Sequence, residues 1–397
     1  MPGTAMTHLE HIADDIGPRG STTPQEREAA AYARKHFESL GLETHWEAFT
    51  SPATGWRPFS VAAIAGVIAV AVFWLGGAIG ALAAGIGMAI TTASVFMEMY
   101  FQPNLLRAFM PKGSSQNVWA RIPAAGDARR RILIVGHIDT HRTPWVFTSP
   151  GRLKFFRLVT TLGTASFVLS AAFFLASAFL DLSGIRWLAL AFVPIYLVVL
   201  ALTWQPDTTP YTHGANDNGS GASIVLSLAE RLKQSPLRNV EVWAMCSGCE
   251  EVGSHGVQAF VKQHRSDLPG VIGISVDNVG GKGAGVCYTT VEGMVIPFRP
   301  SPELIGVADR IKAERPDLNA YSMPYTILHT DATCLMVNRV PSLSFVGLTP
   351  GGVIPDWHQV TDTFGRIDPK PIEATEEFVL EVLRRLDEQA SSANPHE

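Results

Sequence analysis

Six acidic or histidine side chains mark places in this sequence where chemistry is possible. They are His137, Asp217, Glu250, Glu251, Asp277 and His358. Most of them stand where a short apolar run ends or a helix begins: His137 follows RILIV, and Asp277 ends VIGISV. Adjacent glutamates after an apolar strand, as in VEVWAM-CSGC-EE, are costly to bury unless they are paired or bind a metal. Two histidines and three carboxylates suit a pair of divalent ions of the zinc type.

Each residue taken alone also has an ordinary structural explanation. His137 and Asp139 on an extended segment would point the same way, so that the carboxylate steers the imidazole, yet a surface loop is an equal reading. Asp217 or Asn218 in the glycine-rich segment 214–221 would serve as a helix cap. The glutamate pair would also fit a solvated turn. Only the complete set, in this order, favours a metal site.

Strands alternate with helices around these residues. Strands are predicted at 131–135, 240–245, 271–276 and 342–346, and helices at 221–232, near 254–264 and at 372–389. This alternation predicts an α/β fold, a mixed and mostly parallel sheet with helices on both faces. In such sheets, sites form beyond the carboxyl ends of the strands, which is where most of the six residues fall.

Composition sets further bounds on the 397-residue chain. The net charge of -5 leaves no basic footprint for nucleic acid, so no nucleic-acid partner is expected. Charged residues make up 17%, below the usual share of about a quarter in soluble proteins, and mean hydropathy is +0.16. Four cysteines are too few for a disulfide scaffold. Residues 1–20 contain no apolar segment of the signal-peptide type.

Two apolar blocks account for the excess hydrophobicity. The first, Phe59 to Met97, holds 39 residues without a charge, about twice the roughly 20 that one membrane-spanning helix needs. The second contains uncharged runs from Leu158 to Leu180 and from Trp187 to Trp204, separated by a short polar loop. We predict two hairpins, about four transmembrane helices, with the first pair at 58–76 and 79–98. Buried helices of a soluble protein are the alternative, which runs of this length disfavour.

The charges beside these blocks predict an orientation. On the side of the remaining chain lie Arg57, Arg107, Lys112, Arg152, Lys154 and Arg157. The far side has only Arg186, so the positive-inside rule predicts an integral protein of the cytoplasmic membrane with its polar part in the cytoplasm. Four aromatic residues are expected as interfacial anchors: Trp74, Trp187, Tyr196 and Trp204.

As a set, the polar segments resemble peptidase family M28, which includes leucyl-type aminopeptidases and glutamate carboxypeptidases. That family shows H-x-D, G-A-x-D-N-x-S-G, E-E-x-G-x-x-G-S, D-x-x-G and a late H before a D-T pair; this sequence has GHIDT, GANDNGSG, EEVGSHG, DNVGG and WHQVTDT. The match covers residues 1–57, 114–150 and 208–390, with the hairpins as insertions. Families M20 and M42 share the ligand order, but M20 enzymes insert a lid domain for which Asp277 to His358 is too short.

The resemblance implies a zinc exopeptidase-like fold, peptide substrates, two divalent ions (zinc is expected) and a role for each residue. Asp217 would bridge both ions, His137 and Asp277 would complete one site, and Glu251 and His358 the other. Asp139 would support His137. Glu250 would act as general base, taking a proton from the attacking water and passing it to the leaving amine.

The sequence also departs from the family pattern. Where the family often has S-D-H, this chain has His329-Thr-Asp331-Ala-Thr, so the histidine is missing or displaced to His329. The contact that stabilises the transition state is therefore unassigned. Cys246 and Cys249 precede the glutamates as C-x-x-C, for which two buried thiols are favoured over a redox pair or a metal clip.

Two other functions stay open beside an aminopeptidase. One is a non-catalytic membrane protein that keeps the fold for binding, although such relatives have lost ligands that this chain retains. The other is a related amide hydrolase or glutaminyl-cyclase-like enzyme. The sequence leaves open the residue specificity, amino- versus carboxypeptidase action, the native metal and the oligomeric state.

The predicted organisation follows from these assignments. The peptidase domain comprises 1–57, 99–154 and 205–390, the hairpins are 58–98 and 155–204, and 391–397 is a disordered tail. Because His137 and Asp217 must reach one site, the second insertion must cross the membrane an even number of times. Both insertions enter near the site, so we predict an active site close to the bilayer surface and short or apolar peptides as substrates.

Overall fold

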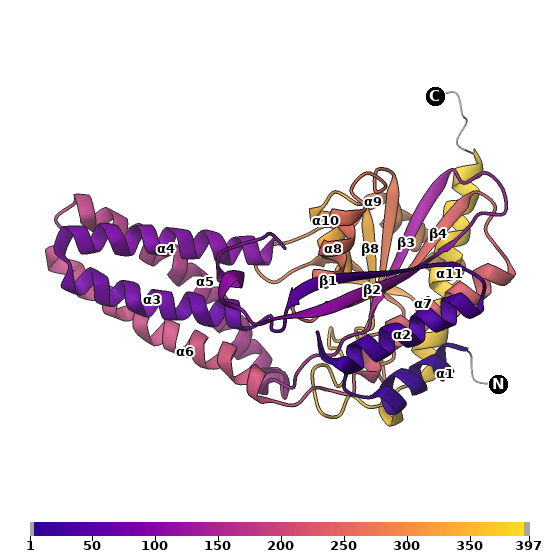
Figure 1. Ribbon diagram of the computed structural model, residues 1–397, viewed down its shortest axis with the longest axis horizontal. Helices are drawn as coiled ribbons and strands as arrows, with labels where there is room; N and C mark the ends of the chain where they lie inside the picture. Colours follow the sequence, from indigo (N-terminus) through magenta and orange to yellow (C-terminus); the bar gives the residue numbers. More distant parts are fainter. Residues whose placement is uncertain (1–3, 393–397) are drawn as a thin grey trace. The chain divides into compact units, whose positions relative to one another are not determined.

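A computed structural model describes residues 4–392, which group into two units. The first unit comprises the described parts of Met1–Ser51, Lys112–Arg142 and Tyr211–Glu397. The second comprises Pro52–Pro111 and Thr143–Pro210 and consists mainly of long helices (Figure 1).

These limits differ from the predicted domain boundaries at four places. The sequence predicts residues 52–57, 99–111, 143–154 and 205–210 as parts of the peptidase domain, whereas they group with the long helices. In the predicted tail, 391–397, residues 391 and 392 belong to the last helix, and residues 393–397 lie outside the described part of the chain.

The first unit is built on an eight-stranded sheet with the order β1-β2-β4-β3-β5-β8-β6-β7. Its strands are β1 (Glu43–Pro52), β2 (Lys112–Ile122), β3 (Arg130–His137), β4 (Val240–Ser247), β5 (Val271–Asp277), β6 (Cys287–Glu292), β7 (Tyr321–Tyr325) and β8 (Ser342–Val346). β3 pairs in parallel with β4 and β5, β5 with β8, and β6 with β7, whereas β2 joins β4 antiparallel. The predicted mixed, mostly parallel sheet is therefore confirmed.

Helices cover both faces of this sheet. The α-helices of the first unit are α1 (Thr4–Glu10), α2 (Pro24–Ser39), α7 (Ser220–Gln234), α8 (His255–Gln263), α9 (Pro302–Glu314), α10 (Asp331–Val337) and α11 (Pro369–Ser392). Two π-helical turns precede α2 and α7, namely η1 (His11–Ile16) and η6 (Ala215–Gly219). The strand and helix positions predicted around the site agree with β3, β4, β5, β8, α7, α8 and α11 to within three residues.

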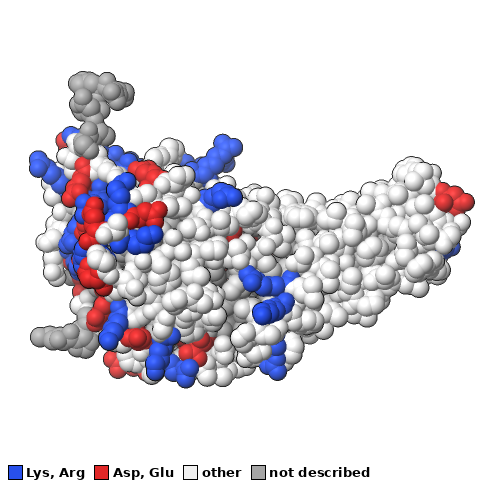
Figure 2. Space-filling model, turned by 180° about the vertical axis from the view of Figure 1, so that it is seen from behind, with Lys and Arg blue, Asp and Glu red and all other residues white. Residues whose placement is uncertain are grey.

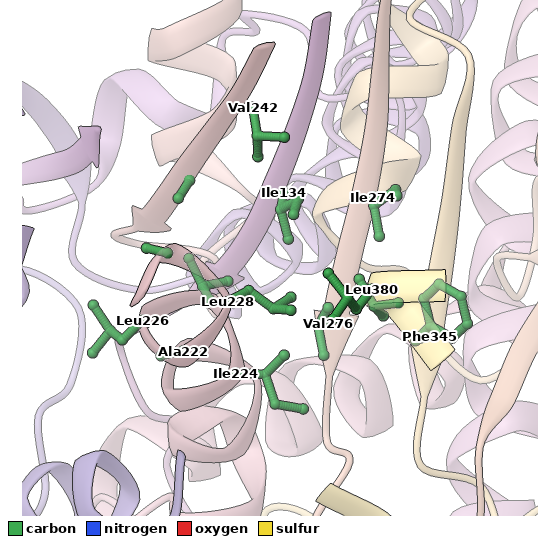
Figure 3. Packing of buried hydrophobic residues seen from close by; sticks show 14 of the residues in the cluster. Ile134, Ala222, Ile224, Leu226, Leu228, Val242, Ile274, Val276, Phe345 and Leu380 are labelled. Carbon is green, nitrogen blue, oxygen red and sulfur yellow. The ribbon is translucent and has the colours of Figure 1, made fainter. Parts of the chain in front are cut away.

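Alternation along the strands divides the apolar side chains between the two faces. Ile134 of β3, Val242 of β4 and Ile274 of β5 share one buried cluster with residues of α7 and α11 (Figure 3). On the opposite face, Trp243 packs edge-on against Phe260 of α8, with ring centroids 6.1 Å apart. The central strands are thus apolar on both sides, which is typical of a parallel sheet.

A close backbone approach at two glycines brings three elements together at the site. Gly136 is the second-last residue of β3, and a Cβ atom there would lie 2.7 Å from the carbonyl carbon of Gly221 in α7. A Cβ atom on Gly221 would lie 2.0 Å from the carbonyl oxygen of Val276 in β5. Only glycine therefore lets the start of α7 lie directly against the ends of β3 and β5.

The second unit contains four apolar helices that are long enough to cross a membrane. They include α3 (Arg57–Leu75), α4 (Gly77–Met99), α5 (Pro150–Phe179) and α6 (Phe192–Trp204), the last preceded by the 3₁₀ helix η4 (Ser183–Ala191). Their mean hydropathies of 1.8 to 2.2 are in the range of spanning segments. On the face shown in Figure 2, the long helices carry almost no charged residues between their ends.

Two details of this unit differ from the sequence predictions. α5 begins at Pro150, eight residues before Leu158, because Ser149 caps it by accepting a hydrogen bond from the amide of Arg152. Tyr196, expected as an interfacial anchor, is fully buried, and its hydroxyl donates to the Ser166 carbonyl at 3.0 Å. Trp187 and Trp204 are 60% and 46% exposed.

We expect Gly136→Ala to lower the free energy of unfolding by about 1–3 kcal/mol, because its methyl group must push backbone apart. Thermal unfolding of the purified protein measures the change. Gly306→Ala in α9 is the matched control, since the nearest atom to its new methyl group, Arg310 Nη1, is 3.9 Å away. This control is expected to equal or exceed the wild type in stability. A Gly136→Ala protein as stable as the control would contradict the close approach.

Candidate metal centre

The predicted ligands meet at the carboxyl ends of the parallel strands. His137 is the last residue of β3 and Asp277 the last of β5. Asp217 lies in η6 directly before α7, Glu251 follows β4, and His358 comes from the long segment after β8. All five side chains are buried or nearly so, the two histidines being 2% exposed. Segments far apart in the sequence thus converge in one place.

The donor atoms fall into two groups that share one carboxylate. In the first, His137 Nε2 lies 3.4 Å from Asp217 Oδ1 and 3.5 Å from Asp277 Oδ1. In the second, His358 Nε2 lies 3.0 Å from Asp217 Oδ2 and 3.4 Å from Glu251 Oε2. The two oxygens of Asp217 therefore face different histidines, which is the arrangement of a bridging ligand.

A further histidine joins the second group. His141, which the sequence analysis does not single out, offers a ligand atom within 4.8 Å of those of Glu251 and His358. Its ring stacks on His358 with centroids 3.7 Å apart. It lies two residues beyond Asp139, so the motif H-x-D-x-H carried a signal that could have located it.

The residues present fit a pair of cations. Asp217 Oδ2 and Glu251 Oε1 are buried and accept no hydrogen bond from any residue between 4 and 392. Burial raises the pKa of Glu251 well above its usual range, and the nearby Asp217 charge raises it further. Carboxylates held together without water need positive charge to stay ionised, and the nitrogen and oxygen donors here match a zinc-type ion.

Asp139 positions both the glutamate pair and His137. Its Oδ1 accepts from the amide of Glu250 at 2.9 Å, and its Oδ2 accepts from the amide of Glu251 at 3.1 Å and from Ser21 Oγ at 2.6 Å. The His137 Nδ1 lies 3.5 Å from Oδ1 and donates to the Asp139 carbonyl at 3.1 Å. One carboxylate therefore orients the turn that presents both glutamates.

Glu250 stands beside the two donor groups without belonging to either. It is 8% exposed, its Oε2 lies 3.9 Å from His137 Nε2, and its Oε1 accepts from Ser254 Oγ at 3.3 Å. Burial raises the pKa of Glu250 well above its usual value, and the charge of His137 opposes this rise. A carboxylate in this position has the reach and the proton affinity of a general base.

Several supporting residues escape detection in the sequence. Asp362 accepts from the amides of Asn216 and Asp217 at 2.6 and 3.0 Å, and thereby fixes the loop that carries the shared carboxylate. Arg19, fully buried, donates to the Gly214 carbonyl at 2.7 Å. Asp362 belongs to the quoted motif WHQVTDT and could have been found there, whereas nothing around Arg19 marks it.

The region of the missing family histidine is occupied by other groups. Asp331, at the start of α10, accepts from Ser247 Oγ at 2.6 Å, and Ala332 follows it. His329 belongs to neither donor group, and burial lowers its pKa to about 4. Tyr325, 3% exposed, has its pKa raised first by burial and then by the charges of Asp277 and Asp217, so its side chain lies near the centre.

The cysteines before the glutamate pair are buried free thiols, as predicted. Burial raises the pKa of Cys246 to about 12. The Cys249 thiol donates to Glu26 Oε1 at 3.4 Å, and the same oxygen accepts from the Cys249 amide at 2.9 Å. Neither thiol lies in a donor group with the metal-ligating candidates.

The mixed sheet with helices on both faces is the fold of solved zinc exopeptidases. Solved structures with this fold include the zinc aminopeptidase BSAP from Bacillus subtilis, with a TM-score of 0.58 and 14% identity over 96% of this chain and 94% of that one. The Bacteroides thetaiotaomicron glutaminyl cyclase bound to N-acetylhistamine has a TM-score of 0.53 and 14% identity, over 96% of each chain. At these identities the likeness shows the fold alone.

Sequence comparison places the chain more narrowly. Residues 204–383 match the model of Peptidase family M28. Aminopeptidase YwaD of Bacillus subtilis (strain 168) is 38% identical over 63 residues, which are 16% of this chain and 14% of that protein. The predicted relation to M28 metallopeptidases is therefore confirmed.

We expect Asp139→Asn to lower zinc affinity about 10- to 100-fold, because an amide cannot accept from both glutamate amides. Competition with a chromophoric chelator measures the affinity. Asp127→Asn removes an exposed carboxylate between β2 and β3 and is expected to leave affinity unchanged. Equal affinities of the two variants would show that Asp139 does not position the site.

Proposed function

We propose that this protein is a membrane-anchored, zinc-dependent hydrolase of peptide bonds that acts most readily on amino-terminal residues. The observation that carries the proposal is the shared carboxylate: Asp217 presents one oxygen 3.4 Å from His137 and the other 3.0 Å from His358. A binding protein that only kept the fold would have no need to retain both donor groups.

The proposed ligand assignment follows the two groups. His137 and Asp277 would hold one ion, Glu251 and His358 the other, and Asp217 both. Two bound cations would lower the pKa of water and polarise the scissile carbonyl. Asp139 keeps the glutamate turn and His137 oriented throughout the reaction.

In the proposed mechanism Glu250 moves the proton. Its carboxylate takes a proton from the attacking water, which leaves hydroxide to form the new bond to the carbonyl carbon. The protonated Glu250 then gives this proton to the leaving amine nitrogen as the carbon–nitrogen bond breaks. Burial raises the pKa of Glu250, which suits both proton transfers. The carboxyl group must hold the proton after the water has lost it and until the amine leaves.

We expect Glu250→Gln to lower kcat about 100- to 10,000-fold while the bound metal is retained, because glutamine cannot accept the proton. Hydrolysis of leucyl 4-nitroanilide and metal analysis of the same preparation measure the two quantities. Glu28→Gln, an exposed change on α2, is the control and should keep wild-type activity. Full activity of the Glu250→Gln protein would refute the mechanism.

Peptides with an amino-terminal glutamine distinguish a peptidase from a glutaminyl cyclase by their products. A peptidase releases free glutamine from them, whereas a glutaminyl cyclase releases ammonia and leaves the peptide bond intact. We propose hydrolysis, with short apolar peptides as preferred substrates, because an anchored enzyme meets peptides that partition into the bilayer. Equal rates for apolar and polar amino-terminal residues would remove that preference.

The four apolar helices support the proposed membrane anchoring. At one end of the second unit, Arg57 pairs with Asp207 at 2.6 Å and lies over the Trp204 ring at 3.8 Å. At the other, Arg186 donates to the Trp74 carbonyl at 2.9 Å and lies over its ring. Arginine and tryptophan together at both ends of an apolar bundle are typical of the two interfaces of a bilayer. The positive charges place the catalytic unit, in this proposal, in the cytoplasm.

Cysteine labelling in intact cells tests this orientation. Gly184→Cys lies near the start of η4, between α5 and α6, and we expect it to react with a membrane-impermeant maleimide added outside. Asp127→Cys, exposed in the first unit, should react only after lysis. The native cysteines are buried and give a low background. The reverse labelling pattern would place the catalytic unit outside the cell, and extraction of the protein by alkaline carbonate would exclude a spanning anchor.

A further inference from the structure

A second cluster of metal-ligating side chains lies in the first unit, away from the candidate centre. It consists of His8 on α1, His36 on α2 and Glu230 on α7. Their donor atoms all lie within 4.8 Å of one another. None of the three contributes to the site described above, and none has a role in the proposed reaction.

The nitrogen–oxygen distances between these donor atoms fall within the range found at the candidate centre. His8 Nε2 lies 3.1 Å from Glu230 Oε1, and His36 Nε2 lies 3.2 Å from the same oxygen. The corresponding nitrogen–oxygen distances at the candidate centre run from 3.0 to 3.5 Å. Tetrahedral zinc with bonds of about 2.0–2.1 Å places neighbouring donors about 3.3 Å apart, so both clusters have the separation that one ion requires.

Both imidazoles are held by their other ring nitrogen. His8 Nδ1 hydrogen-bonds with the Tyr32 hydroxyl at 2.6 Å. His36 has a backbone hydrogen bond with Leu226, and its Nε2 has no hydrogen-bond partner among the described residues, so we assign this bond to Nδ1. Metal-binding histidines have Nδ1 hydrogen-bonded to a neighbour and the Nε2 lone pair turned to the ion. In His8, Nε2 hydrogen-bonds with Glu230 Oε1 at 3.1 Å, a contact that an ion between the two atoms would replace.

This arrangement leaves an electrostatic conflict that a cation resolves. When Nδ1 of His36 carries its proton, Nε2 of the neutral ring turns a lone pair toward a carboxylate oxygen 3.2 Å away. A proton on Nε2 would also remove the conflict, and the charge of Glu230 favours it. Burial nevertheless lowers the pKa of both His36 and His8 as the largest effect, and His36 lowers the pKa of His8 further. The side chains are 8%, 13% and 17% exposed, so an ion has access to them.

We propose that His8, His36 and Glu230 bind a third divalent transition-metal ion of the zinc type, which joins α1, α2 and α7. Two histidines and one glutamate supply three ligands, and water completes the tetrahedron. Because the ligands come from three helices, the ion stabilises the packing of the amino-terminal helices on the sheet domain. It takes no part in peptide hydrolysis.

Metal counting after equilibration with Zn²⁺ and removal of loosely bound ions tests the proposal. We expect wild-type protein to hold one more zinc ion per chain than His36→Gln or Glu230→Gln. The matched control is His264→Gln, since His264 contacts Glu47 and Asp267 through opposite ring nitrogens and so lacks a convergent donor set. Equal zinc counts in wild type and both cluster variants overturn the proposal. The difference of one ion is independent of how many ions the candidate centre holds.

Two measurements do not depend on changing a ligand. Tyr32→Phe keeps all three donors, and we expect the same zinc count with an affinity about 10-fold lower, because His8 loses its orienting partner. Anomalous diffraction at the zinc edge from wild-type crystals in saturating Zn²⁺ should show a peak between the three side chains. If the candidate centre shows full zinc occupancy and no peak lies between these three side chains, a proton joins them instead. This result overturns the proposal.

Discussion

Buried negative charge is the constraint on which the first unit depends. The carboxylates concerned, none of them more than 8% exposed, include Asp139, Asp217, Glu250, Asp277, Asp331 and Asp362. Such groups remain ionised only opposite positive charge or hydrogen-bond donors. The chain supplies backbone amides to Asp139 and Asp362, and hydroxyls to Asp331 and Glu250. Asp217 Oδ2 has no such donor and faces His358, so the sheet and loops are organised around the small volume where the donor groups meet.

Much of the site could be predicted because its residues sit at points that local sequence can mark. His137 and Asp277 end apolar strands, and Asp217 precedes α7 in a glycine-rich turn, so their place at the strand ends followed from periodicity and topology. The N-cap of α7 is Gly219 and not the predicted Asp217 or Asn218, although Asn218 Oδ1 accepts from the Gly221 amide in the first turn. Which carboxylate oxygen faces which histidine depends on three-dimensional geometry and was implied only by the family resemblance.

The parts that escaped prediction depend on contacts between distant segments. The edge strand β1 alternates polar and apolar residues weakly and is stabilised by its one neighbour in the sheet, β2. Arg19 and Glu26 act through partners more than 190 residues away, Gly214 and Cys249, and isolated arginines and glutamates are ordinary surface residues in any sequence. Tyr196 was assigned to an interface by residue type, whereas its hydroxyl partners, Ser170 and the Ser166 carbonyl, lie in the neighbouring helix.

The strand order has a consequence for how the chain is made. β1 and β2 are neighbours in the sheet although α3 and α4 separate them in sequence, and β3 pairs with β4 across α5 and α6. During synthesis the ribosome must therefore complete each helical insertion before the adjoining strand can find its partner. His358 is the last ligand candidate to emerge, and α11 follows it. Pairings of such long sequence separation form slowly and leave strand edges exposed meanwhile, so a nascent chain of this protein stays dependent on protection from aggregation until translation is almost finished.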